Sequence, residues 1–381
     1  MAARPINGEM LLLARNRRRI TQTELARETG VAQAAISRIE NGTRDGLSQE
    51  EIQSIARFLE FPISFFYEQD PLYRTPMSLH GAAFRKRSSV SAKDQNVVVA
   101  LANLYVMHYR RLLEAVDIEP QYPLLQFEII NDKSSVSENA NGVTSASEAA
   151  RKIRSSWQLD SAPISNLIQL VEATGVLVAE GDFESADVDG VTLRPPGMKP
   201  VILLNKNRPV DRKRFSLAHE YGHVVLHTFP HEAMEHEANE FAGELLMPRS
   251  SILPDLKREL SIPRLGQLKY KWRVSMSALI YRAKILGAIS DQTATKLYKK
   301  MSAFGYRKQE PLEFDIPPEY GKSAPQLVEL HLKDLAYSIE EIANAVRITP
   351  VEFANMHGIP VSDIQGTPRT KPKLKLVANS G

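Results

Sequence analysis

Residues 214–248 read RFSLAHEYGHVVLHTFPHEAMEHEANEFAGELLMP. Within this stretch, His219, Glu220 and His223 form the pattern His-Glu-x-x-His. On a helix the two histidines lie one turn apart on one face, where both imidazoles can reach a single tetrahedral metal ion. Three protein ligands leave a fourth position for a water with a pKa of about 7, and Glu220 is the expected general base for that water. The pattern predicts a zinc site that hydrolyses a peptide or amide bond.

The third ligand is expected from the helical segment 235–247, which offers Glu235, His236, Glu237 and Glu240. The run Glu235-x-x-Ala238-Asn239 resembles the Glu-x-x-Ala-Asp/Asn helix of zinc peptidases, and this resemblance implies that Glu235 binds the metal. Asn239 falls one turn later and is expected to hold a ligand from the second shell. Glu237 lies about 200° around the helix from Glu235 and is expected to face away.

Two alternatives bear on this site. A bare His-Glu-x-x-His also occurs in unrelated helices, where the two histidines form only a structural pair. The apolar residues of the segment suit a buried core helix and favour the metal site: Leu217, Ala218, Val225 and Leu226.

The metzincin pattern needs a third histidine six residues after the second. Position 229 is Phe, and His227 and His231 have the wrong spacing for that pattern.

The segments RFSLAHEYGH and EHEANEFAGELLMP resemble the ImmA/IrrE family of zinc-dependent metallopeptidases. The resemblance continues through residues 151–159, 201–205 and 271–290, so it covers roughly half of the chain. It implies a zincin-like domain with a short mixed or antiparallel sheet and a bound Zn²⁺. A strand beside the active-site helix can bind an extended substrate through its edge, and Val201–Asn205 is the strand that we expect to do so.

Composition limits the other classes of protein. A length of 381 residues favours two or three domains. The absence of cysteine excludes disulfides, iron–sulfur ligation and a Cys-based zinc site. No run of 18 apolar residues is present and the first residues lack an apolar signal core, so a cytoplasmic protein is expected. The net charge of +3 is only weak evidence for nucleic acid.

Residues 8–67 are predicted to form a compact helical bundle. Thr21 and Glu24 make a capping box at the start of a second helix, and Gly30 supplies the turn that follows it. The run ITQTELARETGVAQAAISRIENG at 20–42 is similar to the XRE (Cro/repressor-type) helix-turn-helix family. The resemblance implies that Ala32–Glu40 is a recognition helix that enters the major groove.

The residues that the resemblance assigns to DNA contact fall in three groups. Gln33, Ala34, Ser37 and Arg38 are expected to face the groove and Gln22 to lie near a phosphate, and Arg15, Arg17, Arg18 and Arg19 are expected to add affinity for the DNA backbone. Residues 1–60 carry nine Lys or Arg against eight Asp or Glu, so the motif and not the net charge supports DNA binding. Two alternatives remain, namely that the arginines form a solvated helix end and that the module pairs with another protein.

The sequence predicts a mainly α chain with a small α+β domain. Three β-rich runs at 175–183, 188–196 and 199–205 precede the His-Glu-x-x-His helix. The predicted parts are a five-helix helix-turn-helix domain at 1–70, a linker with a long helix (92–116) at 71–147, a zinc peptidase domain at 148–305, a helical region at 306–366 and a basic disordered tail at 367–381.

These features favour a transcription regulator that binds a double-stranded DNA operator and cleaves a partner protein, such as a repressor or a toxin or antitoxin partner. A non-proteolytic repressor or antitoxin whose peptidase-like domain is a sensor or interaction module is the main alternative. A general peptidase localised on DNA is a weaker one. The sequence leaves a homodimer open and does not identify the operator, the cleaved partner, the activating signal or the role of the C-terminal region.

Overall fold

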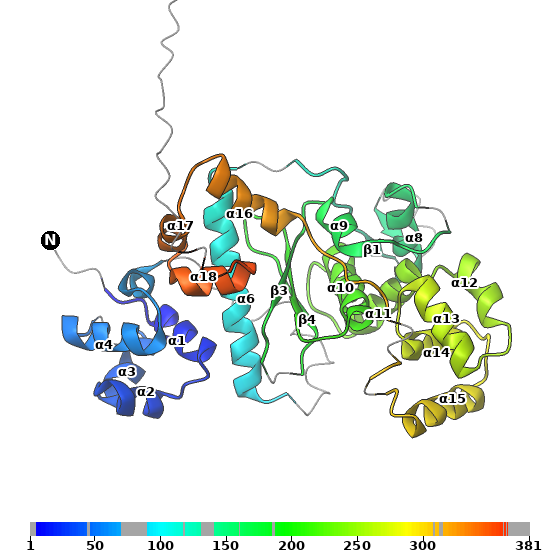
Figure 1. Cartoon of the computed structure of the whole chain (residues 1–381), viewed down its shortest axis with the longest axis horizontal. Helices are drawn as coiled ribbons and strands as arrows, with labels where there is room; N and C mark the ends of the chain where they lie inside the picture. Colours follow the sequence, from blue (N-terminus) through cyan, green and yellow to red (C-terminus); the bar gives the residue numbers. More distant parts are fainter. Residues whose placement is uncertain are drawn as a thin grey trace, which may run out of the picture. The chain divides into compact units, whose positions relative to one another are not determined.

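The computed structural model describes residues 5–43, 46–69, 90–116, 119–130, 141–159, 161–184, 187–307, 309–311, 315–360, 362 and 364. The chain is mainly helical and contains two small sheets (Figure 1). Its internal contacts divide it into two compact units. Unit 1 comprises Met1–Leu72, Gln95–Asp117 and Ser323–Gly381, and unit 2 comprises Tyr73–Asp94 and Ile118–Lys322. The predicted fold class is confirmed.

Unit 1 begins with the expected bundle. Its elements are α1 (Gly8–Arg17), α2 (Gln22–Thr29), α3 (Gln33–Glu40), α4 (Gln49–Leu59) and a 3₁₀ helix, η1 (Ile63–Tyr67). The predicted capping box is present, because Thr21 and Glu24 each satisfy the other's backbone N–H. Gly30 ends α2 in the left-handed conformation at φ 74°, which a residue without a side chain adopts at no steric cost. Local sequence signals therefore define the turn between α2 and α3.

The remaining helices of unit 1 come from distant parts of the sequence. They are α6 (Ala92–Leu113), α16 (Ser323–Lys333), α17 (Ile339–Ala345) and α18 (Pro350–His357). A second capping box, from Ser338 to Glu341, opens α17. Glu68, just after η1, binds Arg111 of α6 at 2.9 Å and Arg347 beside α17 at 2.7 Å. One carboxylate thus links three segments of unit 1.

Unit 2 contains a three-stranded mixed sheet. Its strands are β3 (Leu177–Gly181), β4 (Gly190–Leu193) and β5 (Val201–Asn205), in the order β3-β5-β4. β5 pairs parallel with β3 and antiparallel with β4. The expectation that Val201–Asn205 is an edge strand is wrong. All five of its residues are buried, and all except Asn205 are apolar, as expected of a central strand. Both of its edges pair with neighbouring strands.

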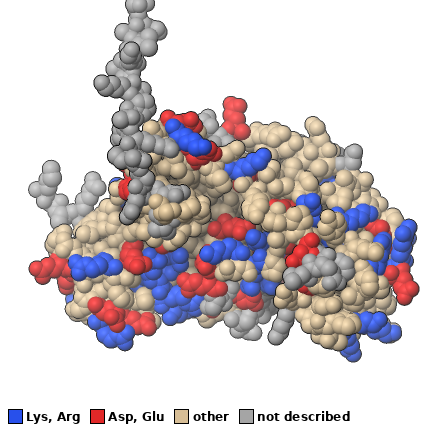
Figure 2. Space-filling model, in the orientation of Figure 1, with Lys and Arg blue, Asp and Glu red and all other residues tan. Residues whose placement is uncertain are grey.

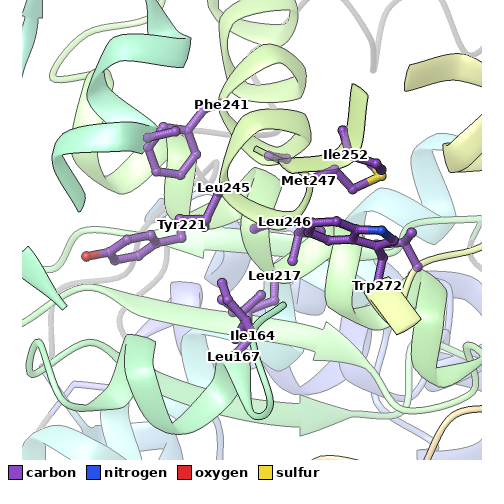
Figure 3. Close-up of a cluster of buried hydrophobic side chains, with 14 of the residues drawn as sticks. Ile164, Leu167, Leu217, Tyr221, Phe241, Leu245, Leu246, Met247, Ile252 and Trp272 are labelled. Carbon is purple, nitrogen blue, oxygen red and sulfur yellow. The ribbon is translucent and has the colours of Figure 1, made fainter. Parts of the chain in front are cut away.

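Helices cover this sheet and hold the core of unit 2 (Figure 1). They are α8 (Ala146–Ser156), α9 (Leu167–Glu172), α10 (Val210–Leu226) and α11 (Met234–Leu246). Figure 3 shows Leu217 and Tyr221 of α10 with Phe241 and Leu245 of α11 in one buried cluster. Burial of each such side chain contributes roughly 1.5–3 kcal/mol. The core therefore fixes α10 against α11, the pair that carries the His-Glu-x-x-His stretch.

Four further helices follow Pro248 and complete unit 2. They are α12 (Arg249–Leu256), α13 (Ile262–Trp272), α14 (Met276–Ile285) and α15 (Asp291–Ala303). Ser275 caps α14 by accepting a hydrogen bond from the N–H of Ala278. A short parallel pair, β1 (Glu128–Ile129) and β2 (Gly142–Val143), makes the second sheet.

Parts of the predicted linker and the whole basic tail at 367–381 lie outside the described residues. Among the helices that are described, none has the length and apolar character needed to cross a membrane. Figure 2 shows acidic and basic side chains interspersed over the described surface on the face in view. This mixture agrees with the small net charge of the chain.

Candidate metal centre and nucleic-acid interface

The structure brings His219, His223 and Glu235 together between α10 and α11. The Nε2 atoms of the two histidines lie 3.1 Å apart. Oε2 of Glu235 lies 3.4 Å from Nε2 of His219, and Oε1 lies 3.4 Å from Nε2 of His223. Donors in a tetrahedral zinc site with bonds of about 2.05 Å are about 3.3 Å apart. The three side chains therefore converge with the spacing that one metal ion requires.

A close approach of two helices makes this convergence possible. A Cβ atom on Gly222 of α10 would lie 3.1 Å from the ring of Phe241 and 3.3 Å from the Cα of Ala238, both on α11. A larger residue would therefore push α11 away from α10 and carry Glu235 away from the histidines. The second x of His-Glu-x-x-His thus has a packing role that the ligand pattern alone did not indicate.

Asn239 fixes the orientation of the first histidine. Its Nδ2 donates to the carbonyl oxygen of Glu235 at 2.7 Å, so its Oδ1 is the atom that faces Nδ1 of His219, at 3.1 Å. An amide oxygen only accepts hydrogen bonds, so Nδ1 of His219 carries the proton. In the neutral ring, Nε2 of His219 is then unprotonated and directed at Glu235, as a metal ligand must be.

The electrostatics of the cluster favour metal-binding protonation states at Glu235 and His223. Burial raises the pKa of the Glu235 carboxyl, but the two imidazoles outweigh burial and hold that pKa far below its usual range. Burial also lowers the pKa of His223, and the nearby carboxylate only partly compensates. For His219 burial again lowers the pKa, but Glu235 and Glu220 outweigh it and raise the pKa. Glu235 is thus ionised and His223 neutral at pH 7, and metals bind these forms.

Glu220 is held by the neighbouring strand. The hydroxyl of Thr192 on β4 donates to Oε2 of Glu220 at 2.7 Å and lies 3.2 Å from its carbonyl oxygen. A Cβ atom on Gly190 would lie 3.2 Å from Cγ of Glu220, so this glycine lets β4 approach the helix closely. At the end of α10, Arg194 donates to the carbonyl oxygens of His223 and Val224. Strand β4 lies within the β-rich run predicted at 188–196, but its contacts with the His-Glu-x-x-His segment were not predicted.

A second set of polar residues lies beside the first. Nδ1 of His227 is 2.9 Å from Nδ1 of His223, and its Nε2 is 2.9 Å from Oε2 of Glu237. His231 lies 3.5 Å from the same carboxylate oxygen. Glu237, which helix geometry predicts to face away from Glu235, contacts His227 and through it the site. The spacing of His227 and His231 in the sequence did not indicate this arrangement.

A cavity of about 310 Å³ lies next to the cluster. Asn239 and His236 of α11 line it, with Phe215 of α10, one turn before His219. Residues of α8 and α14 form the other walls, among them Arg151, Ala278 and Ile285. The cavity therefore provides space for a ligand group beside the side chain that orients His219.

In unit 1, α3 exposes the face that the sequence predicts. Gln33, Ala34 and Arg38 are exposed and Ser37 is partly exposed, whereas Ile36 and Ile39 are buried. This division leaves the predicted groove-facing side chains on the surface.

A chain of side-chain hydrogen bonds supports this exposed face of α3. Gln33 donates to Oε1 of Gln22 at 2.8 Å, and Gln22 donates to Glu40 at 2.7 Å. Arg15 holds Glu40 through two contacts of 2.7 and 2.8 Å. This chain of hydrogen bonds restrains Gln33 on the exposed face of α3.

The predicted backbone-binding arginines have partners within the chain. Arg17 and Arg18 each lie 3.3 Å from the carboxylate of Glu352 on α18, and their side chains are 14% and 21% exposed. Arg19 follows α1 with φ 57°. A phosphate would compete with Glu352 for Arg17 and Arg18, a competition that the sequence could not indicate.

These features define a helix-turn-helix protein that also carries a peptidase-like module. Residues 11–66 match the family model described as helix-turn-helix, and residues 171–284 match that described as IrrE N-terminal-like domain. No curated protein matches the chain. The chain is therefore a fusion of an XRE-type helix-turn-helix domain with an ImmA/IrrE-like peptidase domain, as the sequence predicts.

Proposed function

We propose that the chain is a DNA-binding transcription regulator whose zinc peptidase module cleaves a partner protein of the repressor type. The observation that carries the proposal is the convergence of His219, His223 and Glu235 beside Glu220. A helix-turn-helix domain in the same chain directs such an activity to transcription. The proposal keeps the predicted boundaries of 1–70 for the DNA-binding domain and 148–305 for the peptidase, and places its action in the cytoplasm.

Zinc fits the residues present. The donor set of two imidazoles and one carboxylate is typical of hydrolytic zinc sites, and Oε1 of Glu235 is buried without a hydrogen-bond partner among the described residues. His219, His223 and Glu235 would hold the ion. When bound, zinc would supply a Lewis acid that activates a water and polarises the scissile carbonyl.

Glu220 performs the proton transfers in the proposed reaction. Its carboxylate takes the proton of the attacking water and passes it to the nitrogen of the leaving amine. Thr192 orients this carboxylate through Oε2, so the base is held in place before substrate arrives. Because Glu220 is only 5% exposed, bulk water has little access to it.

The contact between Thr192 and the buried Glu220 also favours a second function. The hydrogen bond from Thr192 gives Glu220 a structural use within the chain, so the presence of this glutamate does not require catalysis. In this alternative the chain is a repressor or antitoxin whose peptidase-like module senses a ligand or binds a protein. It regulates without cutting a peptide bond.

Reporter expression in cells separates the two functions. Glu220→Gln keeps the size and polarity of the side chain but removes the base. The proteolytic function predicts that, in cells that carry Glu220→Gln, the target genes no longer change their expression when the activating signal is given. A response equal to wild type would instead support the sensor function and overturn the proposal.

A further inference from the structure

His227 is buried at the C-terminal end of α10, and both of its ring nitrogens have polar partners. Nδ1 contacts Nδ1 of His223, and Nε2 contacts the carboxylate of Glu237, each at 2.9 Å. The proposed cleavage reaction uses neither His227 nor Glu237. His227 therefore joins Glu237 to a predicted metal ligand through two short contacts.

The partners determine where the protons lie. A carboxylate only accepts hydrogen bonds, so Nε2 of His227 carries a proton and donates it to Glu237. A neutral imidazole has one proton, which leaves Nδ1 of His227 as an acceptor. The short contact between the two Nδ1 atoms then requires Nδ1 of His223 to be the donor. The Nε2 of His223, which faces His219 and Glu235, is therefore unprotonated.

We propose that His227 and Glu237 are positioning residues that hold His223 in the tautomer whose Nε2 binds the metal. This role rests on the metal site of the proposed function. Each of the two predicted histidine ligands then has a residue of α11 that sets its tautomer. Asn239 sets the tautomer of His219 directly, and Glu237 sets that of His223 through His227. Both supporting residues belong to α11, the helix that also provides Glu235.

The same contacts decide against a second metal ion at this place. Donor atoms of His227, His231 and Glu237 lie within 4.8 Å of one another, which would suit a metal. To bind it through Nε2, His227 would have to carry its proton on Nδ1. That proton would meet the one on Nδ1 of His223 across 2.9 Å. Filling the first site therefore opposes filling the second. We call the hydrogen-bonded chain from Glu237 through His227 to His223 the relay, and it predicts one metal ion per chain.

Substitutions that mimic one ring nitrogen at a time test the relay in the full chain. Asn at position 227 places an oxygen near the position of Nδ1, Gln places its polar end near Nε2, and Leu provides neither. We expect His227→Leu and His227→Gln to lower Zn²⁺ affinity about 10- to 100-fold, the usual effect of losing such a support. His227→Asn keeps the acceptor and should restore most of the affinity. Chelator competition with Zn²⁺ measures these constants.

His231→Gln is the matched control, since His231 is 46% exposed and has no contact with His223 among the described residues. It should bind Zn²⁺ like wild type. The visible spectrum of the Co²⁺-loaded chain reports ligand geometry and should change in His227→Leu but not in His231→Gln. Unchanged affinity in His227→Leu, or two Zn²⁺ ions per wild-type chain, would overturn the relay.

Nitrogen NMR of the metal-free chain tests the relay independently of metal binding. The relay predicts that His223 carries its proton on Nδ1 in wild type and that this preference is lost in His227→Leu. A proton on Nε2 of His223 in wild type would contradict it. Failure of wild type to bind Zn²⁺ would overturn the proposed metal site, whereas the tautomer measurement would still decide the relay.

Discussion

The hydroxyl of Thr192 donates a hydrogen bond of 2.7 Å to Oε2 of Glu220, which joins an edge strand of the sheet to the proposed general base. Both side chains are buried, at 0% and 5% exposed. A hydrogen bond to a charged group in such surroundings contributes about 1.5–3 kcal/mol. Strand β4 thus orients the carboxylate of the proposed general base through the hydroxyl group of Thr192.

Thr192→Val should therefore slow partner cleavage about 10- to 100-fold, because valine has the same shape but cannot orient the carboxylate. Zn²⁺ content should stay the same, since no metal donor is changed. Thr192→Ser, which keeps the hydroxyl, should retain most of the rate. Equal cleavage rates for Thr192→Val and wild type would show that this hydrogen bond has no part in the reaction.

Metal analysis tests the third ligand. Glu235→Ala should reduce the bound zinc to well below one ion per chain, because only two imidazoles remain. Glu240→Gln, on the same helix, should keep the ion, since an amide oxygen can still accept from the N–H of Ser147. If Glu235→Ala keeps its zinc while Glu237→Ala loses it, Glu237 is the ligand and the assignment is wrong.

The recognition face of α3 can be tested with the full chain and duplex DNA. Gln33→Ala with Arg38→Ala should relax sequence preference, at about 1–3 kcal/mol for each bidentate base contact that is lost. Arg17→Ala should weaken all sequences alike and reduce the dependence of affinity on salt. Operator selection that is unchanged in the double variant would exclude α3 as the recognition helix.

Two histidines of unit 1, the buried His108 and the half-buried His357, predict an acid-sensitive fold. Burial, with a smaller contribution from His357, lowers the pKa of His108 to about 3, and burial lowers the pKa of His357 to about 4. Above pH 6.5, the ordinary value, both rings are neutral in the folded and unfolded chains. Below it only the unfolded chain takes up protons, so stability falls by about 1.4 kcal/mol per pH unit for each histidine.

His108→Leu should therefore show a smaller drop in melting temperature between pH 7 and pH 5 than wild type does. Both are measured without metal, so that zinc release does not contribute. The exposed-histidine variant His231→Gln should keep the wild-type drop. An identical drop in His108→Leu would mean that this ring does not cause the acid sensitivity.

Much of the fold follows from local signals. The capping residue Thr21 starts α2 where the sequence predicts it, and Ser275 and Ser338 cap α14 and α17 by the same kind of local contact. The three β-rich runs form the three strands of a mixed sheet. His219 and His223 share a helix face because they are four residues apart. Each of these features depends on residues within one turn or one strand.

Features set by packing between distant segments could not be predicted. Its β-rich composition indicates a strand at Val201–Asn205, but only the pairing on both sides makes it central. The contact of Glu237 with His227 depends on how closely α11 approaches α10, which Gly222 permits. The ion pairs of Glu352 with Arg17 and Arg18 span more than 330 residues of sequence. No local pattern encodes such distances.

The central claim is that the module cuts a partner protein with Glu220 as the base. The most direct measurement incubates the Zn²⁺-loaded chain with repressors encoded by neighbouring genes and compares wild type with Glu220→Gln. We predict that wild type cleaves one of them and that Glu220→Gln, with normal zinc content and DNA binding, is about 100- to 10,000-fold slower. Cleavage of that repressor by Glu220→Gln at the wild-type rate would contradict the account.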